Sequence, residues 1–121
     1  MEFTILGHKI REPMRRLETF PTPPNVTNVL LTTDEVTSLC PITGQPDFSR
    51  VTIEYVPGAK CLESKSLKLY LWTFREQGAF IEQMVSDILK DVVEALEPVA
   101  CTVTAEMKPR AVRPRDWSLP K

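Results

Sequence analysis

Histidine, cysteine and glycine are all scarce in this sequence. Its 121 residues include one histidine, His8, together with three cysteines and four glycines. The cysteines match no zinc-binding spacing, and a single imidazole adds little to a metal site, so no metal is predicted. Their odd number also argues against a disulfide framework. These absences exclude the zinc-stabilised and the disulfide-stapled classes of small domain.

Neither sign of charge is in excess, because 15 basic and 16 acidic residues give a net charge of −1. Nonspecific binding of nucleic acid usually needs a basic excess, so no direct contact with nucleic acid is predicted. No apolar run approaches the about 20 residues of a membrane helix. Residues 1–10 lack a basic region followed by a long apolar one, so no secretory signal is predicted and the cytoplasm is the expected compartment.

The chain has the length of one domain, and prolines divide it. Pro21–Pro24 separates an N-terminal arm, residues 1–25, from a body that spans residues 26–110. Residues 111–121 predict an irregular tail. The body is therefore the part that should contain the core.

Hydrophobic patterning predicts the elements of this body. Strands are expected at Val26–Thr33, Arg50–Val56 and Val99–Met107, with at best a weak fourth strand. Apolar residues at helical spacing predict helices at Ser64–Glu76 and Phe80–Leu96. This order indicates an α+β fold, in which two helices cover one face of an antiparallel sheet. So small a sheet has open edges, and open edges invite pairing with other subunits.

Cys40 is the first candidate for chemistry, because it lies in a turn marked by prolines and a glycine. A buried cysteine is among the commonest core residues, so a structural role is one interpretation. In an exposed turn, a thiolate could instead attack an electrophilic carbon, and Asp47 could deliver or accept a proton. Cys61 and Cys101 are expected to be structural.

Hydroxyls and ammonium groups are concentrated in the octapeptide Glu63–Tyr70, which reads ESKSLKLY. One interpretation is a solvated helix start with Ser64 as its N-cap. The other is an anion site, where free backbone N–H groups act with Lys65 and Lys68 on a cofactor phosphate. Glu82 has two interpretations as well: a carboxylate favoured by the helix dipole, or an acceptor for the N–H groups of a purine-like ring.

Taken together, these motifs resemble one family, the NADPH-dependent 7-cyano-7-deazaguanine reductases. These are the QueF nitrile reductases of queuosine biosynthesis, and the likeness is to the short, single-domain type. Several spaced motifs in one order carry the resemblance: Ser38–Pro41, Thr43–Phe48, Glu63–Tyr70, and Phe74-Arg75 followed by Gly78, Phe80 and Glu82.

The resemblance implies the tunnelling fold (T-fold), in which antiparallel sheets from several subunits join edge to edge into a barrel. It also implies a homo-oligomer of pentameric rings, commonly two face to face as a decamer, with active sites at subunit interfaces. The implied reaction converts 7-cyano-7-deazaguanine, a 7-deazapurine nitrile, to 7-aminomethyl-7-deazaguanine. Two NADPH are consumed, and the reaction passes through a cysteine thioimide.

The resemblance also implies roles for individual residues. Cys40 would be the nucleophile and Asp47 the proton donor. The implied substrate contacts are Leu62 through its backbone, Glu63, Ser64, Ile81 and Glu82; the implied NADPH contacts are Lys65, Ser66 and Lys68. Two features depart from the family pattern: Ile81 stands where most members have histidine, and Ala111 follows Pro109-Arg110 where a glycine-rich strand is usual.

Two alternatives remain open from the sequence. The first is a QueF-like amidinotransferase, which transfers ammonia to a nitrile on tRNA and so forms archaeosine. The intact octapeptide favours the reductase over this relative. The second is a non-catalytic binding module of the same fold, in which Cys40 is a buried thiol.

Overall fold

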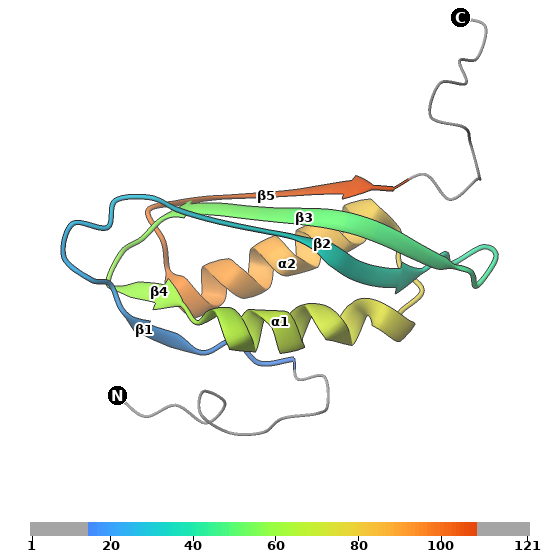
Figure 1. Cartoon of the computed structure of the whole chain (residues 1–121), viewed down its shortest axis with the longest axis horizontal. Helices are drawn as coiled ribbons and strands as arrows, with labels where there is room; N and C mark the ends of the chain where they lie inside the picture. Colours follow the sequence, from blue (N-terminus) through green and yellow to red (C-terminus); the bar gives the residue numbers. More distant parts are fainter. Residues whose placement is uncertain (1–14, 109–121) are drawn as a thin grey trace, which may run out of the picture.

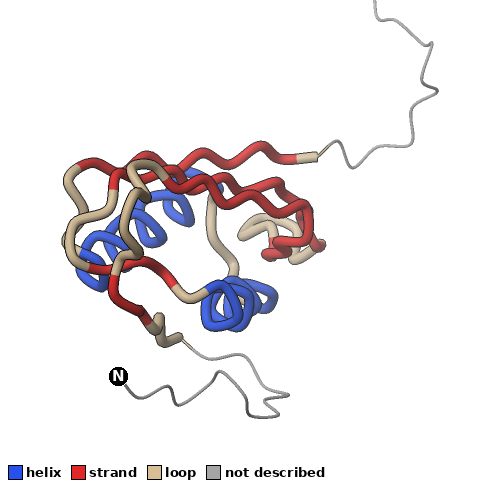
Figure 2. Tube along the Cα trace, turned by 60° about the vertical axis from the view of Figure 1, so that its left-hand side comes forward, coloured by secondary structure: helices blue, strands red, loops and turns tan. Residues whose placement is uncertain are grey.

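The computed structural model describes residues 15–108, which form a sheet with both helices on one side (Figures 1 and 2). The sheet is antiparallel and has the strand order β2-β3-β5. Its elements and the two helices are β2 (Val29–Leu39), β3 (Pro46–Val56), β5 (Ala100–Met107), α1 (Ser64–Trp72) and α2 (Ile81–Leu96). The predicted α+β class and the placement of both helices on one face are confirmed.

A second, two-stranded sheet was not expected as such. It pairs β1 (Thr19–Pro21) with β4 (Lys60–Leu62) in antiparallel register. Strands of three residues are too short to show a period of two, which explains why their patterns carried no signal. In this way residues 19–21 are fixed against the body of the same chain.

The core lies between the three-stranded sheet and the helices. Along β3, alternate residues are buried, as the alternation predicted for this strand. The predicted apolar stripe of the first helix and the first ridge of the second are also buried, apart from Phe80 before α2. The buried residues of β3 and of the two helices as predicted from sequence include Val51, Ile53, Tyr55, Leu67, Tyr70, Leu71, Phe74, Met84, Ile88, Val92 and Leu96. Val99 was placed in the last strand, but it precedes β5 and is 75% exposed.

The first long strand starts later and ends later than predicted. β2 begins at Val29 rather than Val26 and continues to Leu39 through an irregularity between Thr33 and Val36. Asp34 and Glu35, which follow the predicted strand, are residue types depleted in strands. The structure instead accommodates them in a bulge-like register shift, which turns Asp34 toward Arg50.

The start of α1 corrects one assignment. Glu63, not Ser64, is the N-cap, because the Glu63 carboxylate accepts hydrogen bonds from the backbone N–H groups of Lys65 and Ser66. The predicted helix then continues as the 3₁₀ helix η1 (Thr73–Glu76). α2 ends in a left-handed residue, Glu97, directly before Pro98.

Within residues 15–108, none of the helices has the length and apolar character needed to cross a bilayer. The arm up to residue 14 with His8, and the tail with the Ala111 departure, lie outside the described residues.

Candidate active site

Cys40 lies at the tip of the β2–β3 hairpin, where the sequence predicted a turn. Its backbone N–H donates to the Gln45 carbonyl at 2.8 Å, and its carbonyl accepts from the Gly44 N–H at 2.8 Å. Gly44 has φ of 74°, a conformation that favours glycine. The side chain of Cys40 is half-buried, so the closed turn holds its sulfur in place while part of the side chain stays accessible to solvent.

The turn makes the thiol more acidic. A hydrogen bond from the Thr43 side chain, and then the backbone N–H groups of Thr43 and Ile42, lower the pKa of Cys40 below its ordinary value. The negative charge of Asp47 acts in the opposite direction on this pKa. A thiolate is the nucleophilic form of cysteine, so the turn favours the reactive species. The sequence marked Thr43 only as a turn residue, and the contact depends on how the turn closes.

Asp47 is on β3 directly opposite Ser38 of β2, close enough for its charge to act on the Cys40 thiol. Both Asp47 and Ser38 are buried, at 5% and 4% exposure. The Asp47 carboxyl is thus placed to take the thiol proton and to deliver it during addition to a polar multiple bond.

The linker between η1 and α2 places the start of α2 next to this turn. Leu39 donates its N–H to the Gln77 carbonyl at 2.9 Å, and its carbonyl accepts from the Ala79 N–H at 3.2 Å. A Cβ atom on Gly78 would lie 3.7 Å from Cα of Pro41. Ile81 and Glu82 follow in the first turn of α2, with Ile81 half-buried and Glu82 exposed. The candidates on these neighbouring segments, Cys40, Asp47, Ile81 and Glu82, are called here the thiol cluster.

The remaining candidates gather at the start of α1, and the most buried of them hold that helix in place. Glu63 is 6% exposed, and Ser66 is fully buried. The Ser66 hydroxyl donates to the Glu63 carbonyl at 2.8 Å and accepts from the Glu18 N–H at 2.9 Å. Leu62, also buried, donates its N–H to the Tyr55 hydroxyl at 2.9 Å. This second group, Leu62 to Ser66 with Lys68, is called the helix-start cluster.

The helix-start cluster opens onto a groove between α1 and β2. The groove has a volume of about 930 Å³, and its polar lining includes Ser64, Lys65, Lys68, Thr33 and Glu35. Ser64 and Lys68 are exposed, and Lys65 is half-buried. A volume of this size is within the range of small-molecule sites. The two ammonium groups suit a ligand that carries phosphate.

The two clusters lie at opposite ends of α1 and η1 (Figure 1). Glu63 precedes α1, whereas Gln77, which bonds to Leu39 beside the Cys40 turn, follows η1. Nine α-helical and four 3₁₀ residues between them span roughly 20 Å. That length exceeds a bicyclic heterocycle, so within one chain the structure does not bring Glu63 and Ser64 together with Cys40. No group of three or more potential metal ligands is found among residues 15–108.

The contribution of Thr43 can be measured by thiol alkylation. In Thr43→Val, the pH midpoint for alkylation of Cys40 by iodoacetamide should move up toward the ordinary thiol value, because the hydroxyl hydrogen bond to the sulfur is lost. The rate near neutral pH should fall severalfold, while the rates at high pH converge. Peptide mass spectrometry separates Cys40 from the other two thiols. The control is Thr104→Val, at an exposed residue of β5. An unchanged pH midpoint in Thr43→Val would refute the hydrogen bond assigned to Thr43.

The sequence of the chain matches one protein family and several known proteins. The family described as "QueF-like protein" matches residues 46–112. A protein of Syntrophus aciditrophicus named "NADPH-dependent 7-cyano-7-deazaguanine reductase" is 52% identical over 104 residues, covering 84% of this chain and 74% of its own. A protein of the same name from Nitrosococcus oceani is 41% identical over 121 residues, covering 91% and 94%.

The fold also matches a solved structure. The apo form of the archaeosine synthase QueF-Like superposes with a TM-score of 0.67 at 27% sequence identity, covering 73% of this chain and 87% of that chain. The structural likeness thus extends over most of the sheet and helices described above.

Proposed function

The chain belongs to the QueF family, and from this membership and the two clusters we propose that it is an NADPH-dependent nitrile reductase. Its substrate is 7-cyano-7-deazaguanine, and its product is the 7-aminomethyl compound of queuosine biosynthesis. The observation that carries the proposal is the acidified thiol of Cys40 beside the buried carboxyl of Asp47. The cytoplasm is the proposed compartment.

Addition to the nitrile begins at Cys40. The thiolate forms a C–S bond to the nitrile carbon, the nitrogen takes a proton from Asp47, and a covalent thioimide results. A nitrile is a poor hydride acceptor, and a thioimide is a more activated C=N group. Asp47 is buried beside the thiol, so water is restricted where the proton moves. A further proton and the departure of the sulfur are needed before the primary amine is complete.

NADPH, when bound, supplies the two hydrides that the four-electron reduction requires. The groove fits this cofactor, because its size is adequate and the ammonium groups of Lys65 and Lys68 line it. We propose that Lys65 and Lys68 contact the phosphates. Ser66 contributes by holding the helix start, since its hydroxyl is already bonded to Glu63 and Glu18.

Substrate recognition is assigned to both clusters. Glu82 is exposed at the start of α2, where its carboxylate can accept from the ring N–H groups of the deazaguanine. Glu63 uses its carboxylate oxygens for capping, but each oxygen has a further lone pair for a ligand N–H. Ser64 offers an exposed hydroxyl, the Leu62 backbone adds a main-chain contact, and Ile81 packs against the ring.

A complete site then needs two subunits. The roughly 20 Å of α1 and η1 separates the clusters in one chain, and β2 and β5 each have an edge with little or no pairing among the described residues. We propose that sheets join through these edges as a T-fold barrel, in pentameric rings that pair into a decamer. Residues 26–110 form the catalytic domain, with the arm and the tail at either side. The joined subunits bring one chain's thiol cluster to another's helix-start cluster.

Free 7-cyano-7-deazaguanine provides the decisive assay. The protein should oxidise NADPH in its presence, with two NADPH consumed for each amine formed, because each hydride delivers two of the four electrons. Oxidation of NADPH is followed by absorbance, and the product by mass spectrometry. A Glu82→Gln variant should raise KM about tenfold or more through loss of a charged acceptor. Its matched control is Glu54→Gln, because Glu54 is an exposed residue of β3 and belongs to neither cluster.

The second candidate function is that of an amidinotransferase acting on tRNA. The likeness to the archaeosine synthase structure supports this candidate. This activity requires no NADPH. Absence of NADPH oxidation, together with product formed from ammonia and nitrile-bearing tRNA, would select it over the reductase. A protein that shows neither activity and forms no adduct with the nitrile would be a non-catalytic module.

A further inference from the structure

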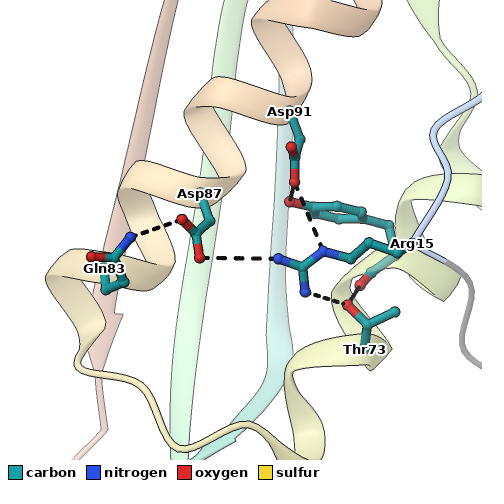
Figure 3. A network of polar contacts seen from close by, with 6 residues as sticks. Arg15, Thr73, Gln83, Asp87 and Asp91 are labelled. Carbon is teal, nitrogen blue, oxygen red and sulfur yellow. Dashed lines mark hydrogen bonds and ion pairs between the residues drawn. The ribbon is translucent and has the colours of Figure 1, made fainter.

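Arg15 connects the chain before β1 to both helical segments (Figure 3). Its guanidinium carbon lies 4.2 Å from the ring centroid of Phe74 and 5.2 Å from that of Tyr70. Its Nη1 donates to the Thr73 hydroxyl at 3.0 Å. A planar guanidinium can stack on rings while donating from its edge, which an ammonium cannot do equally well. Arg15 therefore holds the junction of α1 and η1 from one side.

The same guanidinium reaches α2. Its Nη2 lies 4.0 Å from an oxygen of Asp87, and its Nε lies 3.8 Å from an oxygen of Asp91. Asp91 also accepts the Tyr70 hydroxyl at 2.5 Å, and burial together with this carboxylate raises the pKa of Tyr70, which keeps its proton. Asp87 accepts from the Gln83 amide at 2.8 Å. The network ends at Gln83, the residue that follows Glu82 in the sequence.

Met84 is the core residue of the first turn of α2, and few polar side-chain contacts fix that turn. Phe80, its N-cap residue, makes no side-chain capping hydrogen bond. The linker before it is tied to Leu39 through the Gln77 carbonyl and the Ala79 N–H. The buried ridge Met84, Ile88, Val92 and Leu96 holds α2 against the sheet. The backbone bonds at one end and the Arg15 network along the helix add the polar contacts that orient α2 relative to η1.

We propose that Arg15 is a positioning residue, which through Asp87 and Asp91 fixes the start of α2 and so the placement of Glu82 relative to Cys40. The inference rests on the proposed function for its catalytic consequence. Its structural basis is the set of contacts that joins the N-terminal segment, η1 and α2 in one chain. Arg15 belongs to neither cluster and acts through Glu82, so its effect should appear in substrate affinity.

The test compares Arg15→Met with Arg50→Met. Arg50 makes an exposed ion pair with Asp34 at 2.6 Å and belongs to neither cluster. Its loss also removes an arginine and its contact with a carboxylate. In the full chain, Arg15→Met should raise the KM for the nitrile about fivefold with a smaller change in kcat, because the anchoring carboxylate is misplaced. Arg15→Lys should recover part of the affinity. Alkylation of Cys40 should keep its wild-type rate.

Hydrogen exchange provides a readout that does not depend on activity. Amides in a peptide covering residues 77–83 should exchange faster in Arg15→Met than in wild type or Arg50→Met. Unchanged exchange there, or faster exchange with an unchanged KM, overturns the inference. Absence of turnover in wild type together with faster exchange in Arg15→Met overturns the proposed function and leaves the structural role of Arg15 supported. If Arg15→Met does not fold, the same comparisons are made with Asp87→Asn, which removes one of the ion pairs between Arg15 and α2.

Discussion

A Cys40→Ala protein incubated with 7-cyano-7-deazaguanine in the absence of NADPH should keep its unmodified mass, while wild type gains the mass of one nitrile. The reason is that the thioimide bond forms only at the Cys40 sulfur, whose turn favours the thiolate. Turnover should fall by at least about a thousandfold, the scale on which enzymes lose activity when a nucleophile is removed. Intact-protein mass spectrometry and NADPH oxidation measure the two effects.

Cys101→Ala is the matched control for this loss. Cys101 is half-buried on β5, and burial raises the pKa of its thiol, so it is poorly suited to nucleophilic addition. This variant should form the adduct like wild type. Adduct formation in Cys40→Ala, or its absence in wild type, would eliminate the catalytic role assigned to Cys40.

Two inactive variants should regain activity when they share one oligomer. Cys40→Ala lacks the nucleophile, and Ser64→Trp blocks the helix-start cluster at an exposed position where a larger side chain costs the fold little. If each site takes one cluster from each of two subunits, random mixing leaves about one quarter of the sites intact, because both contributors must be unaltered. Co-expression in equal amounts, followed by the NADPH assay, measures this fraction.

Each variant assembled alone is the control for the mixture. A site built within one chain would give no recovery, because every chain in the mixture then carries one defect. That result would contradict a site shared between two subunits. Assembly would then not explain how two clusters that lie roughly 20 Å apart in one chain could act on one substrate. The recovered fraction should also vary with the mixing ratio as the product of the two unaltered fractions.

Much of the fold was predictable because its elements are long and amphipathic. The stripe Leu67, Tyr70, Leu71 and Phe74 placed α1 correctly, since four apolar residues on one helical face have few other ways to be buried. Elements without a period were not predictable, as in β1 and β4. The cap was also misassigned, because Ser64 and Glu63 are adjacent and either could be the cap. The extended backbone of Glu63 lets its carboxylate accept from the Lys65 and Ser66 N–H groups.

The candidate site divides in the same way. The residue types of Cys40, Asp47 and Glu82 were visible as isolated chemical groups, and Thr43 was visible only as a turn residue. Its hydrogen bond to the thiol could not be foreseen, because it depends on how residues 40–45 close. Arg15 gave no signal at all, since its partners lie more than 50 positions away in the sequence: Thr73 is separated from it by 58 residues.

By itself, the sequence determined the helices, the long strands and the resemblance that identifies the chemistry, because these depend on residue type and local spacing. The tertiary structure decided which groups meet. It brought Asp47 and the start of α2 to Cys40 through strand register and the bonds to Leu39. It also placed the ESKSLKLY helix start at the far end of α1. Such distances depend on how rigid elements pack, and local spacing in a sequence does not encode them.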